Sequence, residues 1–271
     1  MNSYHIYEEE YIKSLKEKEY KYIENIKYFN DKYSTELSKD DNYINLVGKN
    51  LFNEGFNIFN NIINSISNQK IEIIDLSENN ISDLASLKNA KYNNLKELYL
   101  HLNKISNIDI LPHVNFAHLE ILNLAYNNIT DITPLTKSHF HNFQKLYLYF
   151  NNIKDISFVE NDMFKNLFRL DLSHNNIDDI KPLKNSKFEN LEKLILGNNN
   201  INNLEVFNYI KFNKLITLDL SENKIKDVHP IENNFLKLKE LILYNNPINT
   251  KIIKNKDIIL NFKTKIENFI I

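Results

Sequence analysis

The sequence contains no cysteine, only three glycines and only five prolines among its 271 residues. Without cysteine the chain has no disulfides, no thiolate metal ligands and no cysteine nucleophile, and nothing in it indicates an oxidising compartment. The glycines stand at positions 48, 55 and 197, so neither of the glycine-rich loops that bind phosphate in nucleotide-binding proteins is present. These absences exclude several classes of enzyme and cofactor site.

The chain also lacks a strong net charge and a long apolar segment. Its formal charge is −2, with 25% charged residues, which gives no electrostatic reason to expect nucleic acid or an anionic membrane as a partner. No apolar run reaches the ~18 residues of a membrane-spanning helix. The N-terminal stretch "MNSYHIYEEEYIKSLKEKEY" has no apolar segment of a signal peptide. We therefore expect an intracellular protein, in the cytoplasm or nucleus.

An internal repeat runs through most of the chain. Eight asparagines follow one another at a spacing of 24 residues, which shortens to 23 before the last: Asn79, Asn103, Asn127, Asn151, Asn175, Asn199, Asn223 and Asn246. Apolar residues recur at offsets −8, −5, −3, +2, +5 and +8, and around Asn103 they are Leu95, Leu98, Leu100, Ile105, Ile108 and Leu111. Aromatic residues recur at +13: Tyr92, Phe116, Phe140, Phe164, Phe188 and Phe212, with Phe235 one residue early. This period indicates a protein built from stacked units.

Each unit is predicted to be a short strand, a turn and a return segment. Residues at −5 and −3 alternate with polar ones, which is the periodicity of a strand. No unit can bury its apolar side alone, so neighbouring units must stack as a solenoid. We expect a parallel sheet along one face and a spine of the +13 aromatics near the opposite face. Each buried Leu, Ile or Phe stabilises such a fold by roughly 1.5–3 kcal/mol.

The repeated asparagine falls just after the strand, where the chain turns inward. This turn leaves backbone N–H and C=O groups buried without partners in the sheet, and a carboxamide supplies both donors and an acceptor. One unpaired buried group costs about 1–3 kcal/mol. We therefore predict that the eight amides form a structural ladder between successive units, and not a catalytic row.

The segments "LEILNLAYNNITDITPL" and "LFRLDLSHNNIDDIKPL" resemble the leucine-rich repeat family, whose pattern is L-x-x-L-x-L-x-x-N-x-I. The resemblance covers about residues 70–248. It implies an α/β fold, a right-handed horseshoe-shaped solenoid with a parallel β-sheet on its concave face and helical caps at both ends. The endings "DITPL" and "DIKPL" are similar to repeats of protein phosphatase 1 regulatory subunits and of bacterial internalins. The family serves many partners, so the resemblance predicts the fold more specifically than the function.

Smaller regularities follow the asparagine. Asp or Asn recurs at +4, where a side-chain oxygen can cap a tight turn, at Asp83, Asn107, Asp131, Asp155, Asp179, Asn203 and Asp227. Pro134, Pro182 and Pro230 at +7 favour short turns over long helices on the back of the array. The alternative for the +4 row is a line of calcium ligands, but these positions lack the clustered oxygens that Ca²⁺ needs. We expect capping and no metal.

Both ends of the array need a cover over the exposed core. Residues 41–69 contain "LVGKNLFNEGFNIFNNIINSI", which resembles a degenerate repeat of the ribonuclease-inhibitor type, with Lys49 where the family has asparagine. There Asn53-Glu54-Gly55 would open a helix whose apolar face is Phe56, Phe59, Ile62, Ile63 and Ile66. Residues 249–271 are predicted to form the second cap, and the residues at helical spacing in it are Ile258, Ile259, Phe262 and Ile266.

Residues 1–40 are predicted to form an N-terminal helical extension, and they hold seven of the fifteen tyrosines. The residues that permit an amphipathic helix are Tyr11, Leu15, Tyr22, Ile23 and Ile26. This helix would pack on the cap or attach loosely to it. The alternative is that it serves as a second interaction element.

Candidate catalytic and metal-binding groups are few. His139 and His141 flank Phe140 and are expected to point outward, since a strong metal site needs more than two ligands. No motif marks a nucleophile with its base, although a Ser–His–Asp arrangement that meets only in space has no sequence signature. We predict no enzyme activity, no metal, no cofactor and no small-molecule substrate.

The predicted concave face offers the best candidate for a binding site. Offsets −6, −4 and −2 alternate with the buried positions, −1 lies at the rim, and equal offsets are about 5 Å apart in neighbouring repeats. Three repeats then bring together one aromatic patch: Tyr99, His101, Leu102, Asn123, Tyr126, Tyr147, Tyr149 and Phe150. Asp171 and Asp219 lie farther along and would steer a partner carrying Lys or Arg.

Exposed tyrosines on a rigid scaffold favour a protein-binding hot spot, because tyrosine offers a large contact area with little rotamer entropy to lose. The alternative is that tyrosine is simply a good strand residue. The sequence thus predicts a non-catalytic adaptor that binds another protein, and neither nucleic acid nor membrane, on its concave face. Two other functions stay open: a regulatory subunit of a protein phosphatase, and an extracellular adhesion or recognition protein.

Overall fold

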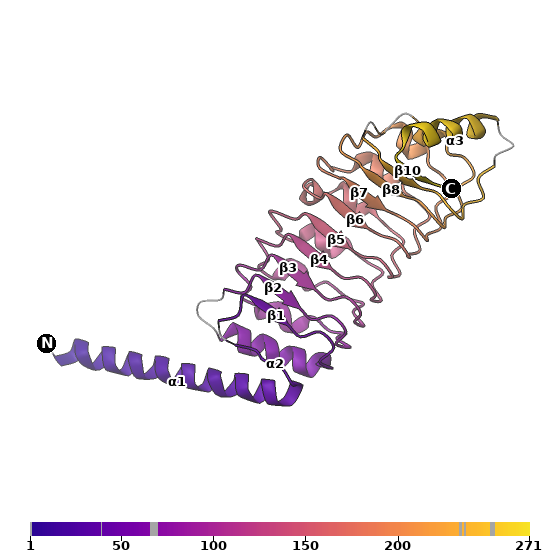
Figure 1. Cartoon of the computed structure of the whole chain (residues 1–271). Coiled ribbons are helices and arrows are strands. Elements are labelled where there is room, and N and C mark those ends of the chain that lie inside the picture. Colours follow the sequence, from indigo (N-terminus) through magenta and orange to yellow (C-terminus); the bar gives the residue numbers. More distant parts are fainter. Residues whose placement is uncertain (1, 39, 66–69, 233–234, 236, 250–252) are drawn as a thin grey trace.

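The computed structural model describes residues 2–38, 40–65, 70–232, 235, 237–249 and 253–271. Ten strands form one parallel sheet, in which each strand pairs with its neighbours in sequence order. They are β1 (Tyr43–Asn45), β2 (Ile73–Asp75), β3 (Glu97–Tyr99), β4 (Ile121–Asn123), β5 (Lys145–Tyr147), β6 (Arg169–Asp171), β7 (Lys193–Ile195), β8 (Thr217–Asp219), β9 (Glu240–Ile242) and β10 (Asn268–Ile270). Figure 1 shows the strands following one another along a solenoid, which is the predicted fold.

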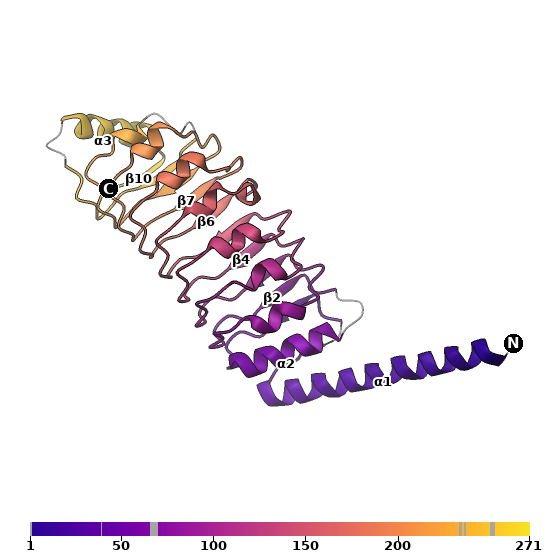
Figure 2. The same ribbon diagram turned by 180° about the vertical axis from the view of Figure 1, so that it is seen from behind.

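Short 3₁₀ helices lie behind the sheet, as Figure 2 shows. They are η1 (Ala85–Asn89), η2 (Leu111–His113), η3 (Thr133–Lys137), η4 (Ser157–Glu160), η5 (Asp162–Phe164), η6 (Lys181–Asn185), η7 (Glu205–Asn208) and η8 (His229–Ile231). Proline stands in the first turn of η3, η6 and η8, where its missing N–H costs nothing. All seven +4 residues accept a hydrogen bond from the N–H two positions later, at 2.7–2.9 Å. These bonds start the turns that lead into the back of each coil.

A ladder of carboxamides joins the coils. Asn151 Nδ2 donates to the carbonyl oxygens of Leu124 and Leu148 at 2.9 Å and 3.0 Å, and its Oδ1 accepts from the N–H of Ile129 at 2.9 Å. Equivalent bonds recur at the other seven asparagines, at 2.6–3.2 Å. Seven of the amides are buried, and Asn246 at the end of the array is half-buried. Each amide therefore satisfies backbone groups of its own coil and of the coil before it.

The apolar side chains of the strands and return segments fill the space between the sheet and the 3₁₀ helices. Phe116 lies between Tyr92 and Phe140, with ring centroids 6.0 Å and 6.3 Å away. From Phe140 the column reaches Phe164 through Phe143, over 5.0 Å and 6.2 Å. It resumes at Phe188, Phe212 and Phe235. The aromatic residues thus pack in a column along the core, on the side of the 3₁₀ helices.

Helix α2 (Phe52–Asn64) covers the first coil. Its buried apolar residues are Phe56, Phe59, Ile62 and Ile63, whereas Ile66 lies outside the described residues. Strand β1 precedes this helix and extends the sheet beyond the first repeat. Lys49, at the asparagine position of this irregular coil, is half-buried, and its Nζ donates to the carbonyl of Ser34 at 2.6 Å. The coil therefore has a strand and a helix but no ladder amide of its own.

Helix α1 (Asn2–Tyr33) meets α2 at its C-terminal part, and the rest projects away from the array in Figure 1. Phe29 is buried 6.1 Å from Phe59, ring centroid to ring centroid. Gly55 permits this crossing, because a Cβ there would come within 2.8 Å of Cζ of Tyr33. No helix in the described part of the chain is both long and apolar enough to cross a membrane.

The face of α1 that packs on the cap differs from the predicted one. Ile23 is 50% exposed, although it was predicted to belong to the apolar face. The side chains that face the cap follow a spacing of three and four residues: Tyr22, Ile26, Phe29 and Tyr33. Of the side chains of Tyr11 and Leu15 the structure describes nothing. Helical periodicity alone did not determine which residues of α1 meet the cap.

The C-terminal end is covered by helix α3 (Ile253–Lys265), where Ile258, Ile259 and Phe262 are buried. After the helix the chain returns to the sheet as β10, and Phe269 packs 5.6 Å from Phe262. The sequence predicted only a helical cap here. Strand β10 was missed because "NFI" has no repeat around it and pairs only through the open edge that β9 presents.

Replacing Asn151 by Ala is expected to lower the free energy of unfolding by about 2–4 kcal/mol, because three buried backbone groups lose their partner. Chemical denaturation followed by circular dichroism measures the change. The matched control is Asn152→Ala, since Asn152 is exposed and directly follows the ladder position; its effect should stay within about 0.5 kcal/mol. Equal effects of both variants would contradict the role of the ladder.

Candidate functional site

The turn after each strand displays one side chain at the rim of the sheet. The residue before each ladder asparagine has a left-handed backbone in all eight repeats, with φ between 51° and 60°. Its N–H still donates to the next coil, as the N–H of Tyr126 does to the carbonyl of Tyr149 at 2.8 Å. The asparagine side chain turns inward here, and the preceding side chain is left exposed or half-exposed.

Four consecutive rim positions carry Leu102, Tyr126, Phe150 and His174. Phe150 stacks between Tyr126 and His174, with ring centroids 4.3 Å and 3.8 Å away and interplanar angles of 11° and 9°. Tyr149 meets Tyr126 edge-on at 5.4 Å and 82°. Leu102 lines the same hollow of about 490 Å³ as Tyr126, Phe150 and His174. We call these five residues the rim cluster.

The backbone at the rim cluster is unfavourable for the side chains it carries. Left-handed φ costs an L-residue about 1–2 kcal/mol, and bulky residues adopt it rarely. Leu102, Tyr126 and Phe150 are nevertheless 43%, 38% and 38% exposed, so core packing does not explain them. Strained backbone that presents apolar side chains to solvent is typical of a functional surface.

The comparisons with known proteins agree with this geometry. A family model described as leucine-rich repeats in two copies matches residues 117–161, and a second model described as a leucine-rich repeat matches residues 67–84 and 165–180. The coils seen here have the strand, the inward asparagine and the return segment of that pattern. The chain is a leucine-rich-repeat protein.

Among solved structures, this leucine-rich-repeat protein is similar to two internalins of Listeria monocytogenes. One, inlF, is 25% identical with a TM-score of 0.63 over 79% of this chain, but the match spans only 56% of the length of that internalin. The other, internalin C2, is 25% identical with a TM-score of 0.59, over 81% of this chain and 88% of that chain. A plant peptide hormone receptor, RGFR1, in complex with RGF2, shares the fold at 19% identity and a TM-score of 0.52, over 68% of this chain and 30% of that chain. No curated protein matches the sequence.

The strand positions of the predicted patch are less exposed than expected. Tyr99, Asn123 and Tyr147 lie side by side in register on β3, β4 and β5, but Asn123 is buried and both tyrosines are half-buried. The OH of Tyr99 donates to Glu97 at 2.6 Å, and burial, followed by this bond, raises the pKa of Tyr99. His101 Nδ1 lies 3.4 Å from Nδ2 of Asn123. Neighbouring side chains on this leucine-rich-repeat sheet cover one another, so the exposed area moves to the rim.

The predicted steering role of Asp171 and Asp219 is not supported by their surroundings. Asp171 is only 6% exposed, and Arg169 Nη2 lies 3.4 Å from its Oδ2. Both aspartates also accept from the N–H and Oγ of the serine two positions later, at 2.6–3.3 Å. These contacts do not support a basic partner, which stays a prediction, because alternation along a strand indicates which side of the sheet a carboxylate faces but not which donors surround it.

Two residues of this surface were missed. His174 continues the column of Leu102, Tyr126 and Phe150 by one repeat, and reading the −1 column farther would have found it. Arg169 lies with its guanidinium carbon 5.1 Å from the ring centroid of Tyr147. Only its place on the strand beside Tyr147 was visible from the sequence, since a cation–π contact depends on side-chain rotamers.

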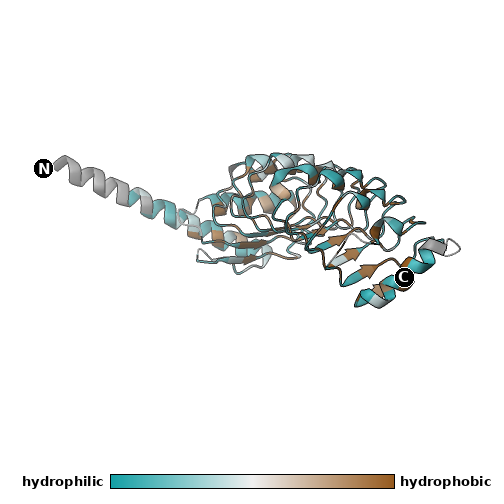
Figure 3. Cartoon of the chain, turned by 90° about the horizontal axis from the view of Figure 1, so that it is seen from above, coloured by the Kyte–Doolittle hydropathy of each residue, from teal (hydrophilic) through white to brown (hydrophobic). Residues whose placement is uncertain are grey.

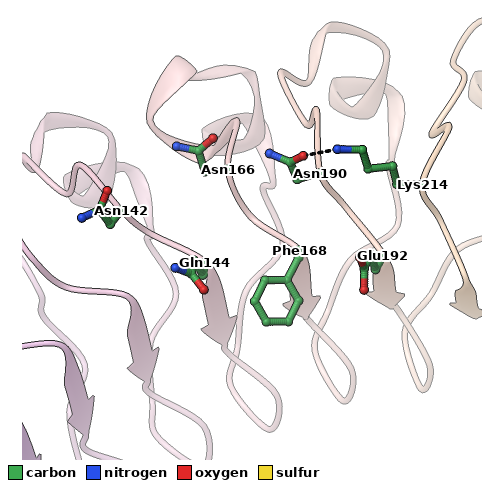
Figure 4. A pocket seen from close by; sticks show the side chains of 7 residues that line it. All are labelled: Asn142, Gln144, Asn166, Phe168, Asn190, Glu192 and Lys214. Carbon is green, nitrogen blue, oxygen red and sulfur yellow. Dashed lines mark hydrogen bonds between the residues drawn. The ribbon is translucent and has the colours of Figure 1, made fainter.

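A separate hollow of about 530 Å³ lies where the chain enters β5, β6 and β7, and Figure 4 shows its lining from successive coils. The lining consists of Asn142, Gln144, Asn166, Phe168, Asn190, Glu192 and Lys214. Lys214 Nζ donates to Oδ1 of Asn190. This lining contains no Ser, Cys or His that could act as a nucleophile or its base. Within the described residues, no group of three or more His, Cys, Asp or Glu could hold a metal ion.

Replacing Leu102 by Asn is expected to raise the free energy of unfolding by about 0.5–1 kcal/mol, because asparagine adopts the left-handed region more readily. The reverse change at the same offset, Asn198→Leu, should lower it by a similar amount, since Asn198 has φ 52°. Thermal and chemical denaturation measure both. A destabilised Leu102→Asn variant would show that Leu102 is held by packing and not displayed against strain.

Proposed function

We propose that the protein is a non-catalytic scaffold that binds another protein on its sheet face. The contact surface consists of the rim cluster together with Tyr147, which lies beside it on β5. The observation that carries this proposal is the stack of Tyr126, Phe150 and His174 at exposed or half-exposed positions of strained backbone. Rigid aromatic side chains bury a large area on binding with little loss of rotamer entropy.

Binding on this scaffold requires no conformational change. The ladder and the aromatic column hold neighbouring coils in register, so the spacing between rim residues is preset. Preorganisation of this kind reduces the entropy that binding would otherwise cost. We place the interaction inside the cell, in the cytoplasm or nucleus, because a chain without cysteine has no disulfide to protect it outside. Phosphatase regulation and extracellular recognition would use the same face, and the identity of the partner separates them.

Replacing both Tyr147 and Tyr149 by Ala is expected to weaken the partner by about 2 kcal/mol, or about 30-fold in dissociation constant. A pull-down from cell extract with the wild type and the double variant identifies the partner, and isothermal titration calorimetry measures the affinity. The fold should be retained, because both side chains are half-buried on the sheet face and outside the core.

The matched control is Tyr209→Ala, which removes an exposed tyrosine on the opposite side of the array, directly after η7. Its set of bound proteins should equal that of the wild type. An unchanged set of proteins on the Tyr147/Tyr149 variant would exclude this face as the interface, and a turnover activity abolished by one polar substitution would favour an enzyme.

A further inference from the structure

A row of three basic residues crosses the sheet face at the start of three strands, whereas the rim cluster follows the strand ends. Lys145, Arg169 and Lys193 occupy the first position of β5, β6 and β7, and the parallel register pairs each with the next. All three are half-buried. The same position is uncharged on both sides of this block, at Ile121 in β4 and Thr217 in β8. We call the three residues the basic row.

The charges of the basic row are only partly balanced by the protein. Arg169 has Asp171 as its counter-charge at 3.4 Å, but its Nε is buried and has no hydrogen-bond partner. Lys145 Nζ lies over the ring of Phe168, 5.2 Å from the centroid. In the described part of the chain neither Lys145 nor Lys193 forms an ion pair. Like charges on directly neighbouring strands destabilise a sheet, so an anion bound along the row would relieve their repulsion.

Tyr147 connects the basic row to the rim cluster. It follows Lys145 on the same side of β5, and the guanidinium of Arg169 lies 5.1 Å from its ring centroid. Tyr149 comes next on that side and packs against Tyr126 of the rim cluster at 5.4 Å. A segment lying across β5 to β7 would therefore meet cations and aromatic rings together.

We propose that the partner segment bound on the sheet face is acidic, with its carboxylates on the basic row and an apolar side chain against the rim cluster. This proposal rests on the function proposed above and names the chemistry of the partner. Charge complementarity of this kind mainly raises the association rate and selects among partners. It reverses the basic partner expected from Asp171, which faces Arg169 and Ser173, and from Asp219, whose Oδ1 accepts from Ser221.

Carboxylates fit the basic row better than phosphates do. Asp171 lies beside Arg169 and reduces the charge of the basic row from three cations to a net of two. A phosphoryl group carries about −1.5 to −2 charges at neutral pH and would meet that carboxylate at close range. Arg169, the residue best suited to hold a phosphate with two parallel bonds, already faces Asp171 and Tyr147. Two single charges spread along the row avoid both conflicts.

The spacing of the strands sets the spacing of the acidic residues. Lys145 and Lys193 are two strands apart, which is about 10 Å at ~4.8 Å per strand. An extended segment that crosses the strands covers this distance in about three residues at ~3.3 Å each. We expect an acidic pair about three positions apart, next to an aromatic or aliphatic residue.

Selection of short random peptides displayed on phage against the purified full-length chain, at low salt, tests this chemistry. The expected result is a set of peptides enriched in Glu and Asp and containing an aromatic or aliphatic residue. Synthetic copies should bind with an affinity that falls as salt rises, by fluorescence anisotropy, and should lose about tenfold when their Glu residues become Gln. A set without excess acidic residues, or no bound peptide at all, would overturn the proposal.

Variants locate the acidic contact. Lys145→Glu with Lys193→Glu should weaken the selected peptides at least about tenfold. Lys145→Gln with Lys193→Gln should weaken binding in the same direction but less. This neutral pair replaces the charge-reversed pair in the test if the charge-reversed protein fails to fold. The control is Lys256→Glu with Lys263→Glu, which makes the same change in net charge at exposed positions of α3. Equal loss in the control would mean that only the overall charge matters and would overturn the proposal.

Further arms separate this proposal from the proposed function. In one outcome, the peptides lose affinity for the Tyr147→Ala/Tyr149→Ala variant but bind the Lys145→Glu/Lys193→Glu variant normally. This outcome would support the proposed interface and overturn the proposal that the partner is acidic. In another outcome, binding depends on the basic row but is unchanged in the Tyr147→Ala/Tyr149→Ala variant. This outcome would place the acidic contact outside the proposed hot spot and overturn the hot spot itself. Tighter binding of a labelled single-stranded oligonucleotide, or of phosphorylated copies of the peptides, would overturn the choice of carboxylates.

Discussion

The structure depends on one interaction, the carboxamide that bridges each coil to the one before it. A coil must turn inward after its strand, and the turn removes backbone donors and acceptors from both the sheet and water. At Asn151 one side chain satisfies the carbonyl of Leu148 in its own coil, and the carbonyl of Leu124 and the N–H of Ile129 in the coil before it. This arrangement is repeated eight times. It lets a thin array exclude water from its core, because buried polar backbone groups are tolerated only when they are paired.

The same turn creates the surface. Since the asparagine points inward, the residue before it adopts a left-handed backbone and its side chain is left at the rim. Every repeat therefore presents one rim residue whatever its type, and at four of the eight positions this chain has Glu or Asn there. In four consecutive coils it has Leu102, Tyr126, Phe150 and His174 instead. The fold thus provides the row of positions, and the choice of Leu, Tyr, Phe and His at four of them gives the row a largely apolar, aromatic surface. At these positions a bulky side chain adopts a left-handed backbone and is also exposed to solvent. Folding alone requires neither of these two unfavourable features.

Charge on the sheet face shows why position and environment must be considered together. Asp171 and Arg169 lie on the same strand and on the same side of it, and the pair neutralises much of its own charge. Lys145 and Lys193, on the strands at either side, have no such counter-charge within the described residues. Two lysine charges of this block are therefore left without an ion pair within the described residues, although the chain as a whole carries a formal charge of −2. Net charge describes the molecule from a distance, whereas recognition depends on the charges left over after local pairing.

The sequence by itself determined the periodic features: the solenoid, the parallel sheet, the positions of the ladder amides and the +4 turn residues. It could do so because each of these depends on contacts between equivalent positions of neighbouring units, so one unit predicts the next. The tertiary structure decided everything that breaks the period. Strand β10 exists because β9 leaves an open edge, the face of α1 depends on how the helix crosses α2 above Gly55, and the burial of Asn123 and Asp171 depends on the side chains beside them. A repeat pattern records which side of a strand a residue takes, but the rotamers and counter-charges around it exist only after the coils have stacked.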